Sequence, residues 1–312
     1  MSNGLYNKYR PTDLLAVKGN QEVVKKLKSK LETSSLSHTI LFHGPRGCGK
    51  TSLARICAAA VGCDPYWDTK EHNCANDTGI DPIREILGLI RNKPMKGKAR
   101  CWILDEVHRL TGQAQSALLK DLEEPPAYVY WFLCTTDPGK LLDTIRSRCA
   151  AGIYEVSPID DVELKLHLMS IARSEGKRVL GSICKQIAQD SLGIPRDAIG
   201  ILESIMDLEP EDMQSAALLA AQKQNAVIDL CQNLFKMASW TTIASIIKNL
   251  KDDPESARRA VMGYCRNTLL NKDHPLAFLI LDEFERSPFF TSGQDGLVRA
   301  CYAVWDSIKN SK

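Results

Sequence analysis

Short apolar runs alternate with amphipathic stretches along the first half of the chain. Four runs of strand length lie at residues 38–42, 100–106, 128–136 and 151–156, and the stretches between them repeat apolar residues at helical spacing. Strands that alternate with helices usually form a parallel sheet with helices on its faces. The pattern therefore predicts an α/β domain over residues 1–156.

Helical periodicity continues without strands beyond that point. Ser157 followed by Pro158 is typical of a helix start, and Gly176 is typical of a helix end. Two further helices are expected around residues 180–192 and 196–207. The three helices together predict a small helical bundle.

The helical half divides into two predicted domains. The three-helix bundle makes a small domain at residues 157–209, and the polar stretch at 207–212 is expected to link it to the rest. Residues 210–312 carry only helical patterns, so an all-α domain is predicted there. The expected fold class is α/β with a parallel sheet, followed by a small helical domain and an all-α domain.

The composition is typical of a soluble globular protein, with 25% charged and 44% hydrophobic residues in a chain of 312. The N-terminus shows no signal-peptide pattern and no apolar run approaches 18 residues, so a cytoplasmic location and no membrane contact are expected. The eleven cysteines are scattered, which favours reduced core residues over disulfides. Since the net charge is only +2, any binding of nucleic acid must depend on a local basic surface.

A glycine-rich stretch follows the first predicted strand and precedes a helix-forming one. Residues 44–51, GPRGCGKT, match GxxxxGK[ST], and Gly62 is the expected helix end. Such a loop points backbone N–H groups at phosphates, with the positive end of a helix behind them. Lys50 would reach the β- and γ-phosphates, and the Thr51 hydroxyl would bind Mg²⁺. A chance glycine turn is the alternative, which the order strand, loop, helix makes unlikely.

The predicted ligand is therefore a nucleoside triphosphate. Its contacts are expected to come from the whole loop and the start of the helix: Gly44, Pro45, Arg46, Gly47, Cys48, Gly49, Lys50, Thr51 and Ser52.

Two later strands end in polar residues that suit the same site. The strand in CWILDEVH ends in Asp105, a candidate Mg²⁺ ligand, and Glu106, a candidate base for the attacking water. The strand in LCTTDP ends at Thr136, whose hydroxyl could bond the γ-phosphate or the water. Strands often end in acidic residues and Thr136 could be a turn residue, so these roles depend on the glycine-rich loop upstream.

Residues 84–100 hold six basic residues and one acidic residue. Asp81 and Pro82 are suitable cap and first-turn residues for a helix there. One face of that helix is apolar (Ile83, Ile86, Leu87 and Ile90), and another presents Arg84, Gly88 and Arg91. A glycine between two arginines would let a sugar-phosphate backbone approach. The alternative is a solvated basic helix with an incidental glycine.

Several segments, in order and at familiar spacing, resemble the AAA+ ATPase subunits of sliding-clamp loaders. They are KYRP at 8–11, GPRGCGKTSLAR at 44–55, ILDEVHRL at 103–110, ALLKDLEEPP at 117–126, TTDPGKL at 135–141 and SRC at 147–149. The similarity covers residues 5 to about 205. It is greatest to the bacterial DNA polymerase III gamma/tau type, with replication factor C small subunits and phage clamp loaders as relatives.

The resemblance implies an AAA+ nucleotide domain, a three-helix lid and a helical collar that forms a pentameric ring. It places Thr136 at sensor 1, where many relatives have Asn, and Arg196 at sensor 2 in the lid. Arg148 matches the arginine finger that reaches the ATP of the neighbouring subunit. The segment near the adenine is matched by Tyr9, Arg10 and Pro11, with Val17 as a further candidate.

The resemblance also implies how DNA is bound. The helix with Arg84 and Arg91 would line the central chamber and track duplex phosphates, and Gln113, Ser116 and Lys120 would extend that track. Because such contacts carry shape and charge, binding should be structure-specific and salt-dependent.

Two departures from the bacterial pattern affect the expected cofactors and source. Relatives usually carry a four-cysteine zinc module, whereas residues 62–81 keep only Cys63 and Cys74, with His72 nearby. Structural zinc needs a full ligand set, so ATP and Mg²⁺ are expected and zinc is not. NCANDTGIDPIR resembles replication factor C and phage loaders, and the tau-type extension is absent, so a compact loader subunit of viral type in a host cytoplasm is a further expectation.

The implied function is ATP-driven opening of a sliding clamp and its placement on primer–template DNA. The implied partners are the clamp, primer–template DNA and other loader subunits in a pentamer. Two alternatives stay open at this point: a structural ring subunit that does not hydrolyse ATP, and another AAA+ DNA motor such as a branch-migration helicase. The intact Lys50, Thr51, Asp105 and Glu106 argue against the first, and the SRC motif and helical tail argue against the second.

Overall fold

The computed structural model describes residues 4–224, 226–250, 254–271, 274–286 and 293–310. The described chain divides into two compact units. One holds the residues up to 171 together with 193–200, and the other holds residues 172–192 and those from 201 onwards. The three-domain division with boundaries after residues 156 and 209 remains a prediction.

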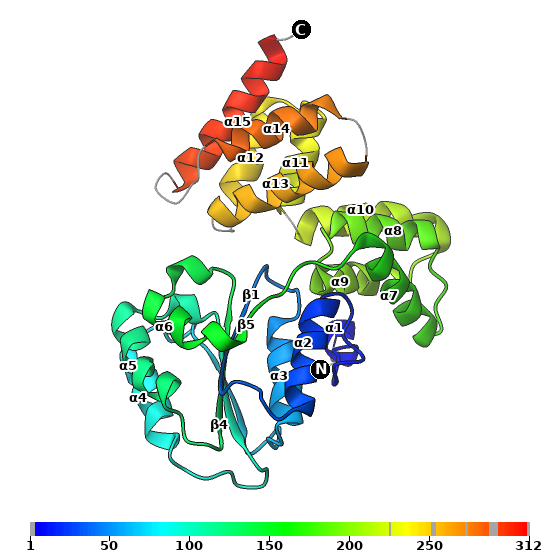
Figure 1. Cartoon of the computed structure of the whole chain (residues 1–312). Coiled ribbons are helices and arrows are strands. Elements are labelled where there is room, and N and C mark those ends of the chain that lie inside the picture. Colours follow the sequence, from blue (N-terminus) through cyan, green and yellow to red (C-terminus); the bar gives the residue numbers. More distant parts are fainter. Residues whose placement is uncertain (1–3, 225, 251–253, 272–273, 287–292, 311–312) are drawn as a thin grey trace. The chain divides into compact units, whose positions relative to one another are not determined.

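The first unit is built on a five-stranded parallel sheet (Figure 1). Its strand order is β2-β3-β4-β1-β5, and every neighbouring pair runs parallel. The strands are β1 (Thr39–His43), β2 (Thr69–Asn73), β3 (Arg100–Asp105), β4 (Val129–Thr135) and β5 (Ile153–Glu155). The four strands predicted from apolar runs are therefore confirmed.

The fifth strand, β2, was not predicted. Its sequence TKEHN contains no apolar residue, and it lies at the edge of the sheet, where it pairs only with β3. An edge strand of this kind has little contact with the core, so backbone pairing rather than hydrophobic pattern defines it.

Helices cover both faces of the sheet (Figure 1). Alternate strand residues point to opposite faces, so Phe42 and Phe132 join one buried core and Leu41 and Leu133 join the other. The first core includes residues of α2 (Gln21–Glu32) and α3 (Lys50–Ala60), and the second includes α4 (Ile80–Leu89), α5 (Gly112–Glu123) and α6 (Asp143–Arg148). The short elements are α1 (Leu5–Lys8), η1 (Val107–Arg109), η2 (Pro138–Lys140) and η3 (Ala150–Gly152).

The first lid helix begins later than predicted. It is α7 (Asp161–Ser174), and the Asp160 side chain caps it by accepting from the N–H of Val162 at 2.8 Å. The Ile159 N–H donates to the Gly193 carbonyl at 2.8 Å. Because this bond holds the backbone before Asp160, Ser157 and Pro158 lie in the connection and not in the helix. The end near Gly176 is confirmed, with a φ of +70° there.

The second half of the predicted linker at residues 207–212 is helical. The helices α8 (Gly181–Asp190) and α9 (Pro195–Ile205) occur as expected, but α10 (Pro210–Gln224) already begins at Pro210. Pro is well suited to the first turn of a helix. Since α10 packs against α8 within the second unit, its start belongs to that packing and not to a free linker.

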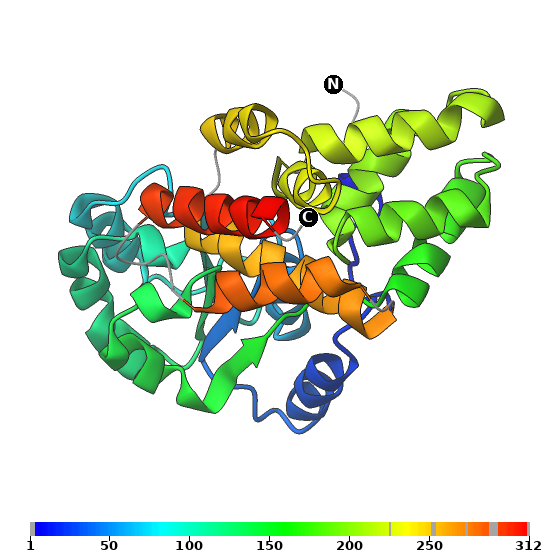
Figure 2. The ribbon, with the colours of Figure 1, turned by 90° about the horizontal axis from the view of Figure 1, so that it is seen from above.

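The rest of the second unit is all helical within its described residues, as predicted. Its helices are α11 (Ala226–Phe235), α12 (Trp240–Asn249), α13 (Pro254–Asn271), α14 (Pro275–Glu285) and α15 (Gly293–Asn310). They share a buried core that includes Leu230, Ile243, Val261 and Phe284. Figure 2 shows α13, α14 and α15 running beside one another over this core.

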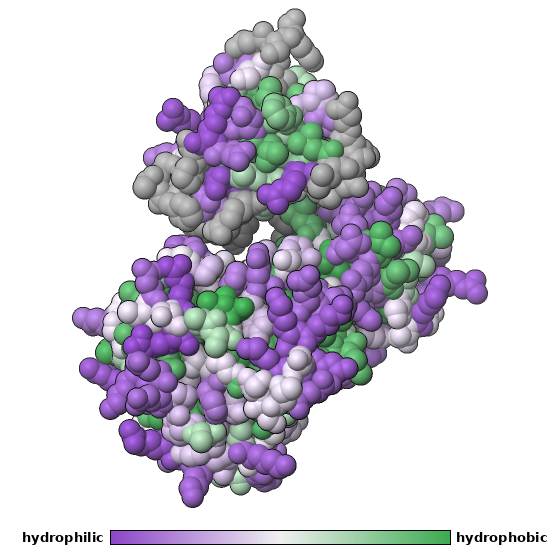
Figure 3. Space-filling view, in the orientation of Figure 1, coloured by the Kyte–Doolittle hydropathy of each residue, from purple (hydrophilic) through white to green (hydrophobic). Residues whose placement is uncertain are grey.

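The distribution of hydrophobic residues on the surface is consistent with buried cores. On the face shown in Figure 3, hydrophilic residues predominate and hydrophobic residues form small separate areas. Among the described residues, no helix combines the length and the apolar character that crossing a bilayer requires.

Candidate nucleotide-binding site

The glycine-rich loop joins β1 to α3, and its glycines have conformations that other residues rarely adopt. The φ angles of Gly44, Gly47 and Gly49 are +139°, +81° and +103°. A Cβ on Gly44 would lie 2.0 Å from the Val156 carbonyl oxygen, and one on Gly47 would lie 2.7 Å from Ile194. Glycine is therefore required here both by backbone conformation and by close packing.

Lys50 lies at the start of α3 and is buried, with 5% of its surface exposed. Its Nζ donates to the carbonyl oxygens of Gly44 and Pro45, each at 2.9 Å. The loop thus encircles the ammonium group of Lys50. Burial raises the pKa of the Cys48 thiol to about 12, so this cysteine is neutral within the loop. Ser52 is also buried, whereas Pro45 and Arg46 are exposed.

The two predicted Mg²⁺ ligands lie together. The Thr51 hydroxyl donates to Oδ2 of Asp105 at 2.9 Å, which joins the start of α3 to the end of β3. The other carboxylate oxygen of Asp105 accepts from the N–H of Glu106 at 3.0 Å. Hydroxyl and carboxylate oxygens are hard ligands, and Mg²⁺ is usually held by few protein groups with water and phosphates completing its shell. The donor set at Thr51 and Asp105 fits that ion.

Glu106 and Thr136 lie side by side at the carboxyl ends of β3 and β4. The Thr136 hydroxyl donates to Oε2 of Glu106 at 3.3 Å. Glu106 has a left-handed φ of +52°, which is uncommon for a residue other than glycine. The structure thus brings the predicted base and the predicted sensor into direct contact.

His108 is a member of this cluster that the sequence reasoning missed. Its Nδ1 is 2.9 Å from the Thr135 hydroxyl and 3.4 Å from Oε2 of Glu106. Burial lowers the pKa of His108 against the raising effect of the Glu106 carboxylate, which favours the neutral ring. The only signal was its position two residues after Glu106 in DEVH.

A pocket next to the glycine-rich loop is lined by the residues expected near the adenine. Its lining includes Tyr9, Arg10, Pro11 and Val17 from the N-terminal segment, Gly47, Cys48, Gly49 and Ser52 from the loop region, and Pro195 and Ile199 from α9. These segments are distant in the sequence, and the fold brings them to one pocket. Their contact with adenine stays a prediction.

Arg196 contacts this region through Tyr6, a residue that the sequence reasoning missed. Its guanidinium donates to the Tyr6 hydroxyl at 3.1 Å and lies 4.8 Å from the centre of that ring. Arg10 lies over the same ring at 5.0 Å. Both arginines therefore contact the Tyr6 ring, which itself lines the pocket. The run YNKY was the only signal for Tyr6.

Arg148 is held away from the loop of its own chain. It lies at the end of α6, where its guanidinium forms an ion pair with Glu123 at 2.6 Å and donates to the Thr144 carbonyl at 3.1 Å. In the described part of the chain, Arg148 is not among the residues that line the pocket beside the glycine-rich loop.

The predicted DNA-contacting face of α4 is exposed. Its apolar stripe is confirmed, since Ile83, Ile86 and Ile90 are buried. Arg84 and Arg91 are exposed, and Gly88 has open space where a Cβ would lie. The helix cap differs from the prediction. The N-cap is Gly79 and not Asp81, and the first turn holds Ile80, Asp81 and Pro82. The extended backbone of Gly79 makes the cap, so Asp81 acts inside the turn, where it pairs with Arg84 at 3.3 Å.

The residues proposed to extend this surface lie on the adjacent helix, α5. Gln113, Ser116 and Lys120 are all exposed, and α4 and α5 pack against one another. The Ser116 hydroxyl donates to the Gly112 carbonyl at 2.8 Å, so part of its hydrogen-bonding capacity is used within the helix. The exposed residues of the two helices are therefore compatible with one surface.

A buried glutamine connects this helix to the start of α6. Gln115 donates from Nε2 to the Leu110 carbonyl at 3.1 Å, and its Oε1 accepts from the N–H of Leu142 at 2.9 Å. It joins the segment after Glu106 to the segment that leads into α6. A polar residue beside the buried Ala114 and Leu118 was the available sequence signal, and it was missed.

The two cysteines of residues 62–81 lie in separate cores. Cys63 is in the core with α3, whereas Cys74 is in the core with α4. Within the described ranges, no group of three or more His, Cys, Asp or Glu side chains is arranged to hold a metal ion.

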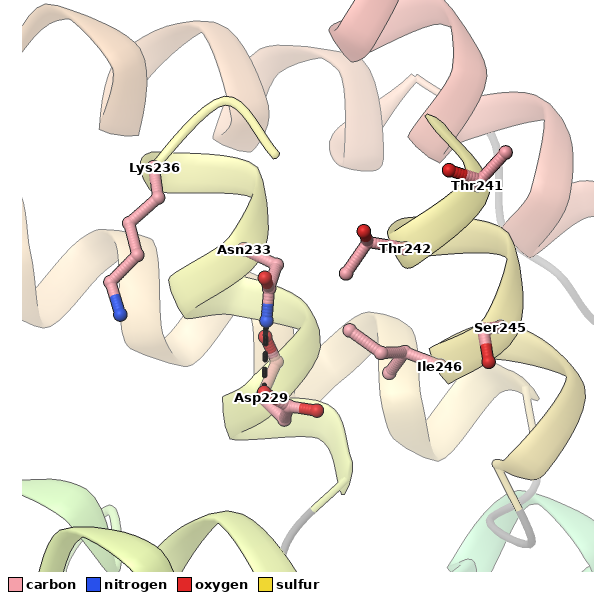
Figure 4. A pocket seen from close by; sticks show the side chains of 7 residues that line it. All are labelled: Asp229, Asn233, Lys236, Thr241, Thr242, Ser245 and Ile246. Carbon is pink, nitrogen blue, oxygen red and sulfur yellow. Dashed lines mark hydrogen bonds between the residues drawn. The ribbon is translucent and has the colours of Figure 1, made fainter. Parts of the chain in front are cut away.

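A second pocket, of about 570 Å³, lies between α11 and α12 (Figure 4). Its lining is mostly polar, and on the α11 side Asn233 donates to the Asp229 carboxylate at 2.9 Å. It has no glycine-rich loop, so the nucleotide site is assigned to the first unit.

Comparisons with known proteins agree with this geometry. Residues 19–78 and 75–156 match the family model described as DNA polymerase III, delta subunit. The DNA polymerase III subunit tau/gamma of Haemophilus influenzae is 32% identical over 219 residues, which cover 64% of this chain and 32% of that protein. The DNA polymerase III subunit tau of Bacillus subtilis is 28% identical over 333 residues, covering 98% and 59%. The chain is thus similar to DNA polymerase III subunits of the gamma/tau and delta types. It spans less than two thirds of the length of these two relatives.

A solved structure supports the fold class. The Thermotoga maritima RuvB Holliday junction branch migration motor superposes with a TM-score of 0.60 over 81% of this chain and 85% of that one. The two sequences are 22% identical. At this identity the likeness shows an AAA+ fold, and it does not favour branch migration as the function. AAA+ proteins in general use a nucleotide with Mg²⁺.

Proposed function

We propose that the chain is an ATPase subunit of a sliding-clamp loader. It would bind and hydrolyse ATP to open a clamp and place it on primer–template DNA, in a pentameric ring with other loader subunits. The observation that carries the ATPase part is the meeting of three groups at one edge of the sheet: the ring of carbonyls around Lys50, the Thr51–Asp105 pair and the Thr136–Glu106 pair. The loader part is supported by the similarity to DNA polymerase III gamma/tau subunits.

The loop residues would bind and neutralise the phosphates. Lys50 exchanges its two carbonyl contacts for the β- and γ-phosphates, and the N–H groups at the start of α3 face the same charge. Thr51 and Asp105 would hold Mg²⁺, which supplies positive charge to the phosphates when bound. Tyr9, Arg10, Pro11 and Val17 would enclose the adenine, because they line the adjoining pocket.

The carboxylate of Glu106 would orient the attacking water and accept its proton. Thr136 donates to one of its oxygens and so fixes its direction while leaving the other oxygen available. His108, in η1 just after Glu106, contacts the same oxygen and also the Thr135 hydroxyl at the end of β4. Arg196 would reach the phosphates from the lid, and Arg148 would act on the site of a neighbouring subunit.

The first test is to separate nucleotide binding from hydrolysis with two variants. Lys50→Ala removes a charged contact to the phosphates, so ATP affinity should fall about 10- to 100-fold, as the loss of a charge-assisted hydrogen bond implies. Glu106→Gln removes the base but keeps the shape, so ATP should still bind while hydrolysis is lost and a clamp-bound complex accumulates. Binding is measured with a fluorescent ATP analogue and hydrolysis by phosphate release.

The matched control is Lys26→Ala, which removes an exposed lysine of α2. An equal loss of ATP affinity in Lys50→Ala and Glu106→Gln would contradict the assigned roles. A wild-type chain that binds ATP but never hydrolyses it with clamp, companion subunits and DNA would favour a structural ring subunit. Strand separation or branch migration without a clamp requirement would favour a different motor.

A further inference from the structure

Two exposed aromatic side chains stand outside the nucleotide site and the proposed DNA track. Tyr66 is 84% exposed and Trp67 is 45% exposed, in the loop between α3 and β2. The loop leads into β2 at Thr69, at the amino end of the strand, whereas Asp105 and Thr136 lie at the carboxyl ends of β3 and β4. The aromatic pair therefore lies near the amino ends of the strands, whereas the candidate ATP site lies at their carboxyl ends.

A basic loop is fixed against these aromatic residues by a buried carboxylate. Asp68 is fully buried, and its carboxylate accepts backbone N–H groups from Met95 at 2.5 Å, Lys96 at 3.0 Å and Gly97 at 2.6 Å. Burial opposes ionisation of Asp68, but these three hydrogen bonds and nearby Arg100 outweigh it and hold its pKa below the usual range. The loop after α4 is thus shaped by an ionised side chain from the aromatic loop.

Backbone contacts interlock the two loops. The N–H of Lys98 donates to the Gly62 carbonyl at 2.8 Å, and a Cβ on Gly97 would lie only 2.3 Å from that same oxygen. The Asp64 carboxylate accepts from the N–H groups of Tyr66 and Trp67, each at 2.9 Å. Both loops therefore have a defined conformation that presents their side chains together.

The result is an aromatic surface bordered by positive charge. Nζ of Lys96 lies 5.1 Å from the centre of the Trp67 ring. Residues 91–98 carry four cationic side chains, those of Arg91, Lys93, Lys96 and Lys98, and no carboxylate. Asp64, the carboxylate of the aromatic loop beside Tyr66 and Trp67, is directed to backbone N–H groups.

This surface continues from the end of α4. Buried Arg100 donates to the Asn92 carbonyl at 3.1 Å, and the Tyr128 hydroxyl donates to the Arg91 carbonyl at 2.8 Å. These two bonds anchor the turn that leads from Arg91 into the basic loop. Phosphates that follow Arg84 and Arg91 along α4 would therefore lead directly to Lys93 and Lys96.

We propose that Tyr66, Trp67, Lys93 and Lys96 form a binding site for single-stranded nucleic acid. Bases stack on exposed aromatic rings, and lysines along the same path bind the phosphates. Duplex DNA hides its bases, so it would leave Tyr66 and Trp67 without a partner. The inference rests on the proposed function, because a loader that engages primer–template DNA also meets its single-stranded part.

The test measures the affinity of the full chain for fluorescently labelled oligothymidylate by anisotropy over a range of salt concentrations. Replacing both aromatics (Tyr66→Ala with Trp67→Ala) should raise the dissociation constant about 10- to 100-fold, the loss expected for one or more stacked bases. The slope of affinity against salt should not change, because no cation is removed. Replacing Lys93 and Lys96 by Ala should instead flatten that slope by about 1.4, since each phosphate contact to a single strand contributes about 0.7.

The matched control is Phe278→Ala, which removes a 65% exposed aromatic of α14. The conservative variant Trp67→Phe keeps an aromatic ring, so it should retain most of the wild-type affinity for oligothymidylate. Unchanged oligothymidylate binding in the aromatic double variant overturns the inference. Loss of clamp binding with oligothymidylate binding intact also overturns it, and assigns the surface to a protein partner. ATPase activity without DNA is measured for the wild type and every variant. If the wild type hydrolyses no ATP but the aromatic double variant still loses oligothymidylate binding, the result supports this site and refutes the proposed function.

Discussion

Single side chains with buried polar groups shape the loops of this molecule. Asp68 organises the segment after α4, and Lys50 is surrounded by carbonyls of the glycine-rich loop. Both are charged residues with 5% or less of their surface exposed. Burying a charge is costly unless hydrogen bonds compensate it, so each depends on its backbone partners.

A prediction at this scale concerns Asp68. Asp68→Asn replaces one acceptor oxygen by an NH₂ group that faces backbone N–H donors. The free energy of unfolding should fall by on the order of 2–3 kcal/mol, the cost of leaving a buried donor unpaired. Chemical denaturation at neutral pH measures this, with Asp77→Asn as the exposed control. Equal midpoints for the two variants would contradict the structural role of Asp68.

The pH dependence follows from the lowered pKa of Asp68. A carboxyl with a folded-state pKa below its unfolded value of about 3.9 stabilises the protein fully above that pH. Its contribution is lost as the pH falls through the lower, folded value. The difference in stability between wild type and Asp68→Asn should therefore be constant near neutral pH and shrink in acid.

At this scale the sequence predicted residues with a fixed motif and missed those defined only by contacts. Lys50, Thr51, Asp105 and Glu106 have identities and spacings that chemistry demands, and the structure brings them together. His108, Gln115, Tyr6 and Asp68 act through partners distant in the sequence, for example Gln115 through Leu142. No local pattern encodes such a partner, so these residues could be found only in the folded chain.

Among the elements, α4 shows most clearly how an apolar pattern in the sequence determines which side chains are buried and which are exposed. Its apolar stripe at helical spacing is buried, which leaves Arg84, Gly88 and Arg91 in solvent. The elements that were missed or displaced lack such a pattern. The edge strand β2 is polar, and the start of α7 is set by the bond between Ile159 and Gly193. Apolar periodicity therefore predicts elements that face the core, and tertiary hydrogen bonds decide the rest.

A prediction at this scale tests the arginine face of α4. Arg84→Ala with Arg91→Ala should lower DNA-stimulated ATPase and leave basal turnover nearly unchanged, because neither residue lines the nucleotide pocket in the described chain. Loss of two duplex phosphate contacts should flatten the salt dependence of DNA binding by about 1.8 in log–log slope. Primer–template binding at several salt concentrations measures this slope. An unchanged slope would mean that the face is only a solvated surface.

The whole chain combines a near-neutral charge with strongly local sites. Its net charge is +2, yet residues 84–100 carry six basic residues and one acidic residue. Average composition therefore gives no support to DNA binding, and the proposal of DNA binding rests on the local charge of α4 and the loop after it. In the same way, the contacts of Arg148 lie within its own chain but away from the pocket of that chain. The function proposed for it requires a second subunit.

The last prediction tests that requirement. Arg148→Ala subunits should bind ATP normally through their own Lys50 loop and hydrolyse it poorly after assembly, because the finger stabilises charge on the γ-phosphate of a neighbour. Glu123→Gln is the matched control, since it frees Arg148 from its ion pair and keeps the guanidinium. Assembled Glu123→Gln rings should therefore retain hydrolysis, and ATPase with clamp and DNA measures both variants.

Mixing Arg148→Ala with Lys50→Ala subunits makes the test decisive. Where a Lys50→Ala subunit presents its intact Arg148 to the intact loop of an Arg148→Ala subunit, one complete site is rebuilt. Some activity should then return in the mixture, although each variant alone is nearly inactive. Native mass spectrometry must show mixed rings for the comparison to count. Mixed rings as inactive as the parents mean either that Arg148 does not act in trans or that turnover needs several intact sites. Titrating wild-type subunits into Arg148→Ala rings separates these two cases. A steep rise in activity indicates that turnover needs several intact sites. A rise in proportion to the wild-type subunits shows that single sites suffice, and the inactivity of the mixed rings then excludes a trans role for Arg148.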